Sequence, residues 1–234
     1  MNTPEFSLVI PLYNEEDNVK PLQDEILRAL DGHNYELILV DDGSTDGTAT
    51  RVTKHPGVRL IRFEINSGQS AAILAGIRAA RAPLIVLLDG DLQNDPADIP
   101  TLLKAMESGA DLVCGYRKHR RDTVVKRITS RVANFVRSRF VGDGIRDTGC
   151  SLKVFRQECA GALVPFKGVH RFIPALIKSA GFRVVEVPVN HRHRRHGVSK
   201  YGLGNRALRA TTDMLGVKWL QSRRIPLDSA RELG

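Results

Sequence analysis

The sequence has no long hydrophobic run and little cysteine, and both absences narrow what the protein can be. Its apolar stretches are shorter than the roughly 20 residues that a membrane-spanning helix needs. The amino terminus does not have the basic and apolar regions of a signal peptide, so we expect a cytoplasmic protein. The three cysteines are odd in number and show no CxxC spacing, which argues against a disulfide framework or a zinc site.

Aromatic residues are also scarce, at 6% of the 234 residues, and few of them stand among the basic runs. Single-stranded nucleic acids are usually held by aromatic side chains in a basic groove, so this composition argues against a nucleic-acid-binding module. With 42% hydrophobic and 26% charged residues, the composition is that of an ordinary globular protein with one substantial core. Disordered and fibrous classes are excluded.

The charge is divided unevenly along the chain. Residues 1–116 carry 9 Lys and Arg against 18 Asp and Glu, a net charge of −9, whereas residues 117–234 carry 26 against 8, a net charge of +18. A basic half of this size suits an anionic membrane surface, a phosphorylated substrate or nucleic acid. The acidic half would have no role in nucleic-acid binding, so we expect no nucleic acid among the partners.

Short apolar runs alternate with amphipathic segments through the chain. The runs are rich in β-branched residues, which is typical of strands buried on both faces of a sheet. This alternation predicts an α/β protein with a mostly parallel sheet and right-handed crossovers. The predicted strands cover residues 6–10, 37–40, 58–63, 84–88, 112–116 and 182–189, and the predicted helices cover 19–30, 66–81, 98–107, 171–177 and 205–220.

Acidic residues recur just after the predicted strands. Asp41 and Asp42 follow the strand at 37–40, and Asp89 and Asp91 follow the strand at 84–88. Parallel strands end at one edge of their sheet, where open α/β sheets bind ligands, so we expect the four carboxylates to gather there. Each of them alone would also suit a solvated turn.

The stretch from Asp89 to Pro96 concentrates oxygen ligands. Asp89, Asp91 and Gln93 alternate, so in an extended segment their side chains project together and offer hard oxygens to Mg²⁺ or Mn²⁺. The phosphates of a substrate would complete the shell, and the metal would neutralise charge on a leaving diphosphate. The sequence therefore predicts a metal and diphosphate site.

The second half combines basic runs with apolar stripes. A basic segment opens at 117–121, and apolar residues recur at helical spacing from Val124 to Phe140. This segment and the last predicted helix either pack on the core with a solvated basic face or lie on an anionic membrane surface. The loop at 191–201 holds three histidines, but its many cations and the lack of an accompanying carboxylate or cysteine argue against a metal there.

Five short motifs, in this order, carry a resemblance to family-2 glycosyltransferases and, among them, to the dolichol-phosphate mannose synthase branch. They are Pro-Leu-Tyr-Asn-Glu at 11–15, Val-Asp-Asp-Gly-Ser at 40–44, Asn-Ser-Gly at 66–68, Asp-Gly-Asp-Leu-Gln at 89–93 and Gly-Val-Ser-Lys-Tyr at 197–201. The resemblance implies inverting, metal-dependent transfer of a sugar from a nucleotide sugar to a polyprenyl phosphate. It also implies a GT-A (Rossmann-like) domain over 1–222, with a nucleotide-sugar and metal half to 116, an acceptor half from 117, and a tail at 223–234.

Matching the motifs residue by residue assigns the donor site. The resemblance implies that Asp89, Asp91 and Gln93 hold Mg²⁺ or Mn²⁺ and that transfer depends on Asp91. Arg194 and Lys200, from an Arg-x-x-Gly-x-Ser-Lys pattern, would bind the diphosphate. The residues that would surround the nucleotide are Pro11, Tyr13, Glu15 and Asp42.

The resemblance also assigns the acceptor site. Arg117, Arg127 and Ser130 resemble the residues that bind the acceptor phosphate, with Lys126 as a substitute for Arg127. No Glu or His stands out as a general base in the basic half, and a phosphate monoester, with a second pKa of roughly 6, is largely ionised at neutral pH without one. If the acceptor were a saccharide or protein hydroxyl, as in other family-2 transferases, an Asp near the metal would have to take its proton.

Many bacterial relatives carry carboxy-terminal transmembrane helices, whereas this sequence ends at Gly234 without one. It therefore resembles the short members of the family, which are soluble or peripheral. We expect the protein in the cytoplasm, at the inner face of the cell membrane. It would reach the lipid through the amphipathic segments at 124–140 and 205–220, or through a membrane-protein partner.

Overall fold

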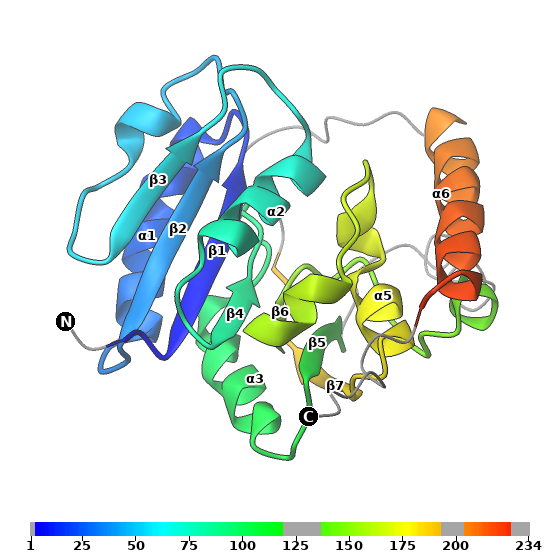
Figure 1. Ribbon diagram of the computed structural model, residues 1–234. Helices are drawn as coiled ribbons and strands as arrows, with labels where there is room; N and C mark the ends of the chain where they lie inside the picture. The colour runs from blue at the N-terminus through cyan, green and yellow to red at the C-terminus, as the bar shows by residue number, and fades with distance from the viewer. Residues whose placement is uncertain (1–2, 119–136, 193–203, 226–234) are drawn as a thin grey trace, which may run out of the picture.

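The computed structural model describes residues 3–118, 137–192 and 204–225, with side chains described from Thr211 onward in the last segment (Figure 1). These residues form a seven-stranded sheet with helices on both faces. The strands are β1 (Phe6–Leu12), β2 (Tyr35–Asp41), β3 (Val58–Arg62), β4 (Leu84–Leu87), β5 (Leu112–Arg117), β6 (Lys153–Arg156) and β7 (Val184–Val189). The main helices are α1 (Glu16–Ala29), α2 (Gln69–Ala79), α3 (Ile99–Met106), α5 (Ile173–Ser179) and α6 (Gly204–Ser222), and residues 137–141 are also helical.

The sheet is mostly parallel, as the sequence predicts. Its strand order is β3-β2-β1-β4-β6-β5-β7. Within the described residues, β6 is the strand that runs antiparallel, and it pairs with β4 on one side and β5 on the other. The sequence analysis did not identify β6 as a strand. The reason is that it has four residues, two of them charged, and so shows neither a long apolar run nor a clear alternation.

Alternate residues of the central strands point to two separate cores. On β1, Leu8 and Ile10 pack into the core that α1 and α3 cover, whereas Val9 packs into the core that α2 and α5 cover. This is why the strands read as continuous apolar runs, since both faces of the sheet are buried. The contact between α2 and β1 is close. A Cβ on Gly76 would lie 2.2 Å from Val9 Cγ1, so this glycine lets α2 rest directly on the strand.

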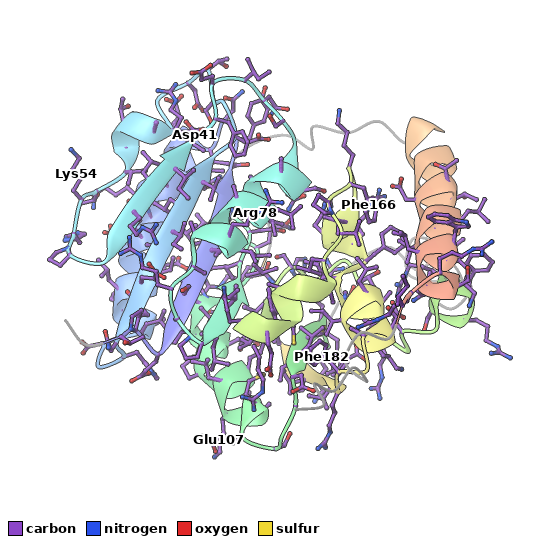
Figure 2. The ribbon with its side chains drawn as sticks, in the orientation of Figure 1. Asp41, Lys54, Arg78, Glu107, Phe166 and Phe182 are labelled. Carbon is purple, nitrogen blue, oxygen red and sulfur yellow. The ribbon has the colours of Figure 1, made fainter. Side chains whose placement is uncertain are left out.

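The strand order reverses its direction between β1 and β4. From β1 the chain moves outward to β2 and β3, and then returns to add β4 on the other side of β1. Such a switch point leaves a crevice beyond the carboxyl ends of the two strands. That edge is the upper one in Figure 2, where Asp41 is labelled, and Glu107 lies at the opposite edge.

The carboxy-terminal helix α6 lies at the end of the molecule, beside α5 (Figure 1). It packs inward through Val217, which is buried, and through Met214. Leu215 and Trp219, which the sequence places on one apolar side, are 55% and 61% exposed. None of the helices in the described ranges has the length and hydrophobicity of a membrane span. Within the predicted apolar stripe at 124–140, residues 124–136 lie outside the described residues.

Candidate functional site

Two loops meet at the carboxyl ends of β1 and β2. The backbone N–H of Asn14 donates to Ser44 Oγ at 2.9 Å, and Asn14 Oδ1 accepts from the backbone N–H of Thr45 at 2.9 Å. The backbone N–H of Glu15 donates to Thr48 Oγ1 at 2.8 Å. Asn14 has a φ of 51°, a left-handed conformation that asparagine tolerates. These bonds fix the motif that contains Pro11, Tyr13 and Glu15 against the Asp-Asp-Gly-Ser loop.

Asp42 holds the loop that precedes α2. Its carboxylate accepts the backbone N–H groups of Ser67 and Gly68, both at 2.8 Å, and the side-chain amide of Asn66 at 3.0 Å. Burial raises the pKa of Asp42, while the N–H groups of Ser67 and Gly68 act in the opposite direction. Both oxygens of this carboxylate thus have donors within the protein. Its predicted contact with a nucleotide stays a prediction.

Gly43 allows this loop to close. Its φ is +69°, and a Cβ at this position would lie 2.6 Å from the backbone nitrogen of Asn66. A side chain would therefore meet both backbone strain and a clash. The glycine of the Asp-Asp-Gly-Ser motif is explained by this close approach.

Asp89 and Asp91 lie at the switch point, directly after β4. Asp89 Oδ1 accepts a hydrogen bond from Gln69 Nε2 at 2.9 Å, and the Ser151 hydroxyl, which donates to Asn94 Oδ1 at 2.7 Å, lies nearby. Burial and the neighbouring negative charge of Asp91 raise the pKa of Asp89 to about 6. Asp91 is 8% exposed and accepts the backbone N–H of Gln93 at 3.2 Å. The structure therefore brings the two predicted carboxylates close enough to repel each other.

The segment that carries these carboxylates is a turn. The sequence analysis assumed an extended conformation, and this was wrong: Leu92 has a φ of +62°, and its buried side chain anchors the turn in the core. Gly90 packs against the end of β1, where a Cβ would lie 2.5 Å from Leu12 Cδ2.

The end of β7 is fastened to the same turn. The backbone N–H of Arg192 donates to the carbonyl oxygen of Gln93 at 2.9 Å. The Arg192 guanidinium pairs with Glu25 at 2.5 Å and with Asp95 at 2.6 Å, and these carboxylates raise its pKa against the effect of burial. The described range that contains β7 therefore ends beside this turn, at Arg192. Arg194 and Lys200 come two and eight positions later and lie outside the described residues.

Arg117, predicted to bind the acceptor, forms a bidentate ion pair. Its Nε and Nη2 donate to the two carboxylate oxygens of Asp147 at 2.6 and 2.8 Å, and its backbone N–H also reaches Asp147 at 3.2 Å. The guanidinium is therefore fixed in place at the end of β5. Arg127 and Ser130 lie outside the described residues, so the predicted acceptor set stays a prediction.

A cavity of about 220 Å³ opens beside Asp89 and Pro11. Six of its polar lining residues were missed by the sequence analysis: Gln69, Thr148, Ser151, Lys153, His170 and Arg171. Gln69 stands directly after the Asn-Ser-Gly motif and Ser151 directly after Asp-Thr-Gly-Cys, so proximity to a motif was a usable signal for these two. Lys153 and His170 carry no such signal, because tertiary packing alone brings them to the cavity.

The donor set at the switch point fits a divalent cation. Within the described ranges, no group of three or more His, Cys, Asp or Glu side chains forms a complete metal site. Mg²⁺ does not require one, because it is usually held by one or two carboxylates together with water and substrate phosphates. Asp89 and Asp91 supply two carboxylates whose mutual repulsion a cation would relieve. Gln93 lies in the same turn, and the ligand role predicted for its side chain stays a prediction.

Open α/β sheets bind their ligands at the switch point, and in this chain two carboxylates lie there. The chain belongs to glycosyltransferase family 2, because the model described as Glycosyl transferase family 2 matches residues 7–163. This confirms the family that the five motifs indicate.

Curated relatives are polyprenyl-phosphate glycosyltransferases by name. Dodecaprenyl-phosphate galacturonate synthase of Rhizobium johnstonii is 42% identical over 224 residues, which cover 91% of this chain and 66% of the relative. Undecaprenyl-phosphate 4-deoxy-4-formamido-L-arabinose transferase of Edwardsiella ictaluri is 39% identical over 204 residues, which cover 84% and 63%. The chain thus spans about two thirds of the length of these relatives.

A solved structure confirms the predicted fold. Glucosyl-3-phosphoglycerate synthase from Mycobacterium tuberculosis, in complex with Mn²⁺, UDP and phosphoglyceric acid, matches 95% of this chain and 80% of its own chain with a TM-score of 0.69. The sequence identity is 22%, so the likeness concerns the fold alone. The shared architecture is the GT-A arrangement of a mostly parallel sheet flanked by helices.

Proposed function

We propose that the protein transfers a sugar from a UDP- or GDP-sugar to a polyprenyl phosphate, with inversion at the anomeric carbon and with Mg²⁺ or Mn²⁺ as cofactor. The observation that carries the proposal is the pair of Asp89 and Asp91 at the switch point of a family-2 chain. The names of the two relatives, which specify dodecaprenyl and undecaprenyl phosphate, support the choice of acceptor.

The nucleotide would lie over the joined loops at the ends of β1 and β2. Pro11, Tyr13 and Glu15 lie on the first loop, and the hydrogen bonds of Asn14 hold that loop in one position. Asp42 would contribute indirectly, because its hydrogen bonds shape the Asn-Ser-Gly turn that precedes α2. A surface fixed in this way binds its ligand without a further cost of ordering the loops.

Asp89, Asp91 and Gln93 would hold the metal, which would neutralise charge on the departing diphosphate. Gln69 orients the Asp89 carboxylate by a hydrogen bond. Arg192 fixes the turn from the other side through its bond to the Gln93 carbonyl. The basic loop begins directly after Arg192. Its residues Arg194 and Lys200 are therefore proposed to bind the same diphosphate.

The acceptor phosphate would need cations to position it and no general base. Arg117, which Asp147 holds at the end of β5, is proposed as one of these cations. Arg127 and Ser130 are proposed to complete this site. The phosphate oxygen would attack the anomeric carbon from the side opposite to the diphosphate, which gives inversion.

The lipid would approach from the membrane at the inner face of the cell. The outward side of α6 supports this, because exposed Leu215 and Trp219 stand beside Lys218 and Arg223, which are also exposed. Trp and Lys or Arg are the usual side chains of helices that lie at a membrane interface. A membrane-protein partner that covers the same side is the other means of attachment.

The test is the synthesis of a glycolipid. The protein is incubated with Mn²⁺, undecaprenyl or dolichyl phosphate and a panel of UDP- and GDP-sugars, and the chloroform-soluble product is measured. We expect one donor to label the lipid, and labelling to vanish when free polyprenol replaces the phosphate. Labelling of a saccharide or protein acceptor instead would assign the chain to the hydroxyl-acceptor members of the family. No transfer from any donor to any acceptor would refute the proposed activity.

A further inference from the structure

Lys153 is a buried cation in the middle of the sheet. It belongs to β6 and is only 3% exposed. Its ammonium group donates to the carbonyl oxygen of Cys150, and it forms no ion pair with a carboxylate of the described residues. A buried charge is costly unless an opposite charge and hydrogen bonds compensate it. An apolar side chain would pack in this strand without that cost.

The register of the sheet places Lys153 beside the metal-site turn. Lys153 is the partner of Leu87 in the antiparallel pair of β6 with β4, and Asp89 comes two residues after Leu87. Diagonal neighbours on one face of such a pair lie about 7–8 Å apart. Lys153 alternates with Phe155, which packs into the core under α2 and α5. Asp89 turns to the same face, where it accepts a hydrogen bond from Gln69 of α2.

The two side chains also share one cavity. Lys153 and Asp89 both line the cavity of about 220 Å³, together with apolar side chains such as Ile73 and Ile173. Burial and the charge of Asp91 raise the pKa of Asp89, and the positive charge of Lys153 acts in the opposite direction. The ammonium group is therefore a cation that compensates Asp89 in the metal-free protein.

A metal held by Asp89 and Asp91 would take over this compensation. The ammonium group and the divalent cation are attracted by the same carboxylates, but they repel each other. The repulsion is strong because the separation is short and the effective dielectric constant of such a site is lower than that of water. Lys153 therefore lowers the affinity of the two carboxylates for a metal. The diphosphate of a nucleotide adds negative charge and raises that affinity again.

We infer that Lys153 takes the place of the metal in the metal-free protein and keeps the affinity for free Mg²⁺ or Mn²⁺ low, so that the metal binds together with the nucleotide. The inference rests on the proposed function, because it requires Asp89 and Asp91 to be ligands of the metal. Lys153 acts through these carboxylates and needs no contact with the substrate. It reduces the repulsion between them for as long as no metal is bound.

The experiment measures the binding of Mn²⁺ alone. Mn²⁺ is titrated into the protein without nucleotide at about pH 8, and the free ion is followed by its electron paramagnetic resonance signal. At this pH the carboxyl of Asp89, with a pKa of about 6, is largely ionised with or without Lys153. Lys153→Met removes the charge and keeps an unbranched side chain. It should bind Mn²⁺ about tenfold or more tightly than the wild type.

Two further variants separate the charge from other effects. Lys153→Gln also lacks the charge but keeps a donor for the carbonyl oxygen of Cys150, and it should show the same gain. Lys178→Met is the matched control. Lys178 also donates to a backbone carbonyl, that of Asp143 at 3.0 Å, but it is exposed on α5 and its loss should leave the affinity for Mn²⁺ within about twofold. A site that is merely damaged loses affinity, so a gain is not the result of general destabilisation.

Thermal unfolding gives a second readout. A ligand that binds only the folded protein raises the Tm, and it does so more when it binds more tightly. At one concentration of Mn²⁺ without nucleotide, the rise in Tm should be larger for Lys153→Met than for the wild type. Lys178→Met should show the same rise as the wild type.

Each outcome decides a different question. An unchanged or weaker affinity for Mn²⁺ in Lys153→Met would overturn the inference. A gain that Lys153→Gln does not share would also overturn it, because that gain would come from packing. If Lys153→Met does not fold by circular dichroism, Lys153→Gln alone decides, with the same gain expected. A wild type that binds Mn²⁺ as tightly without UDP as with it would contradict joint binding, whereas no binding of Mn²⁺ even with UDP would refute the proposed function.

Discussion

The side-chain amide of Gln69 donates a hydrogen bond to Asp89 at 2.9 Å. The residue before it, Gly68, donates its backbone N–H to Asp42 at 2.8 Å. The first residues of α2 therefore connect the two acidic motifs of the chain, one after β2 and the other after β4. Because the connection is a single short turn, a change at Asp42 is expected to disturb the surroundings of Asp89.

Asp42→Ala should weaken both the fold and the binding of UDP with Mn²⁺. The substitution leaves the partly buried N–H groups of Ser67 and Gly68 without their acceptor, at a cost of up to about 1–3 kcal/mol each in the free energy of unfolding. Asp42→Asn keeps one acceptor oxygen and should lose less stability. Urea unfolding and calorimetry measure the two effects. An Asp42→Ala protein with unchanged stability would show that these hydrogen bonds do not hold the loop.

Gly43→Ala tests the close approach of the two loops. The new Cβ would lie 2.6 Å from the backbone nitrogen of Asn66, in a residue with a φ of +69°. Gly32→Ala is the matched control, because Gly32 has a φ of +82° but nothing within 4 Å of its Cβ position. Both variants pay the cost of a left-handed alanine, roughly 1 kcal/mol. We expect Gly43→Ala to lose clearly more stability than Gly32→Ala in thermal unfolding, and equal losses would contradict the explanation given for Gly43.

Asp91→Asn should abolish sugar transfer while the fold is retained. The substitution removes one of the two carboxylates proposed for the metal and keeps an oxygen that can accept the N–H of Gln93. Loss of one group that stabilises developing charge typically costs about 10²–10³-fold in kcat. Glu64→Gln, at an exposed position, is the control for a lost negative charge and should keep full activity. Transfer by Asp91→Asn at more than a tenth of the wild-type rate would remove Asp91 from the metal site.

The sequence predicts the parallel part of the sheet well because those strands are buried on both faces. Val9 and Ile10 face different cores, yet both must be apolar, which gives an unbroken apolar run. β6 was not predicted, because it shows no such unbroken apolar run. Its Lys153 is buried by tertiary packing, and local sequence does not encode that burial.

The site was predictable where residues adjoin a motif and unpredictable where packing assembles it. Asp89 and Asp91 were found because they follow a buried strand. The bend at Leu92 was not, because leucine seldom adopts a positive φ and carries no local signal for it. His170 reaches the cavity through its bond to Ser70, a residue 100 positions earlier in the chain.

Metal binding should depend on pH near 6. Burial and the charge of Asp91 raise the pKa of Asp89 to about 6, above its ordinary value of 3.8. In the metal-free protein this group therefore contributes stability that is fully present below the ordinary pKa and is lost as pH rises through 6. Metal binding has the opposite dependence, because only the ionised carboxylate is a ligand. We expect the affinity for Mn²⁺ with UDP to fall as pH is lowered from roughly 7 to 5, and a constant affinity over that range would contradict the ligand role of Asp89.

Trp219 offers a direct test of membrane contact, because it is the only tryptophan in the sequence and is exposed on α6. If the outward side of α6 enters a bilayer interface, vesicles with anionic lipid should shift its fluorescence emission to shorter wavelength. Salt should weaken the effect, since Lys218 and Arg223 contribute by charge. Leu215→Glu should weaken it by removing apolar area and adding a negative charge, whereas Ile65→Glu, at an exposed position outside α6, should lose less. An unchanged emission with anionic vesicles would exclude insertion of this helix. Attachment through a membrane-protein partner would then remain as the alternative.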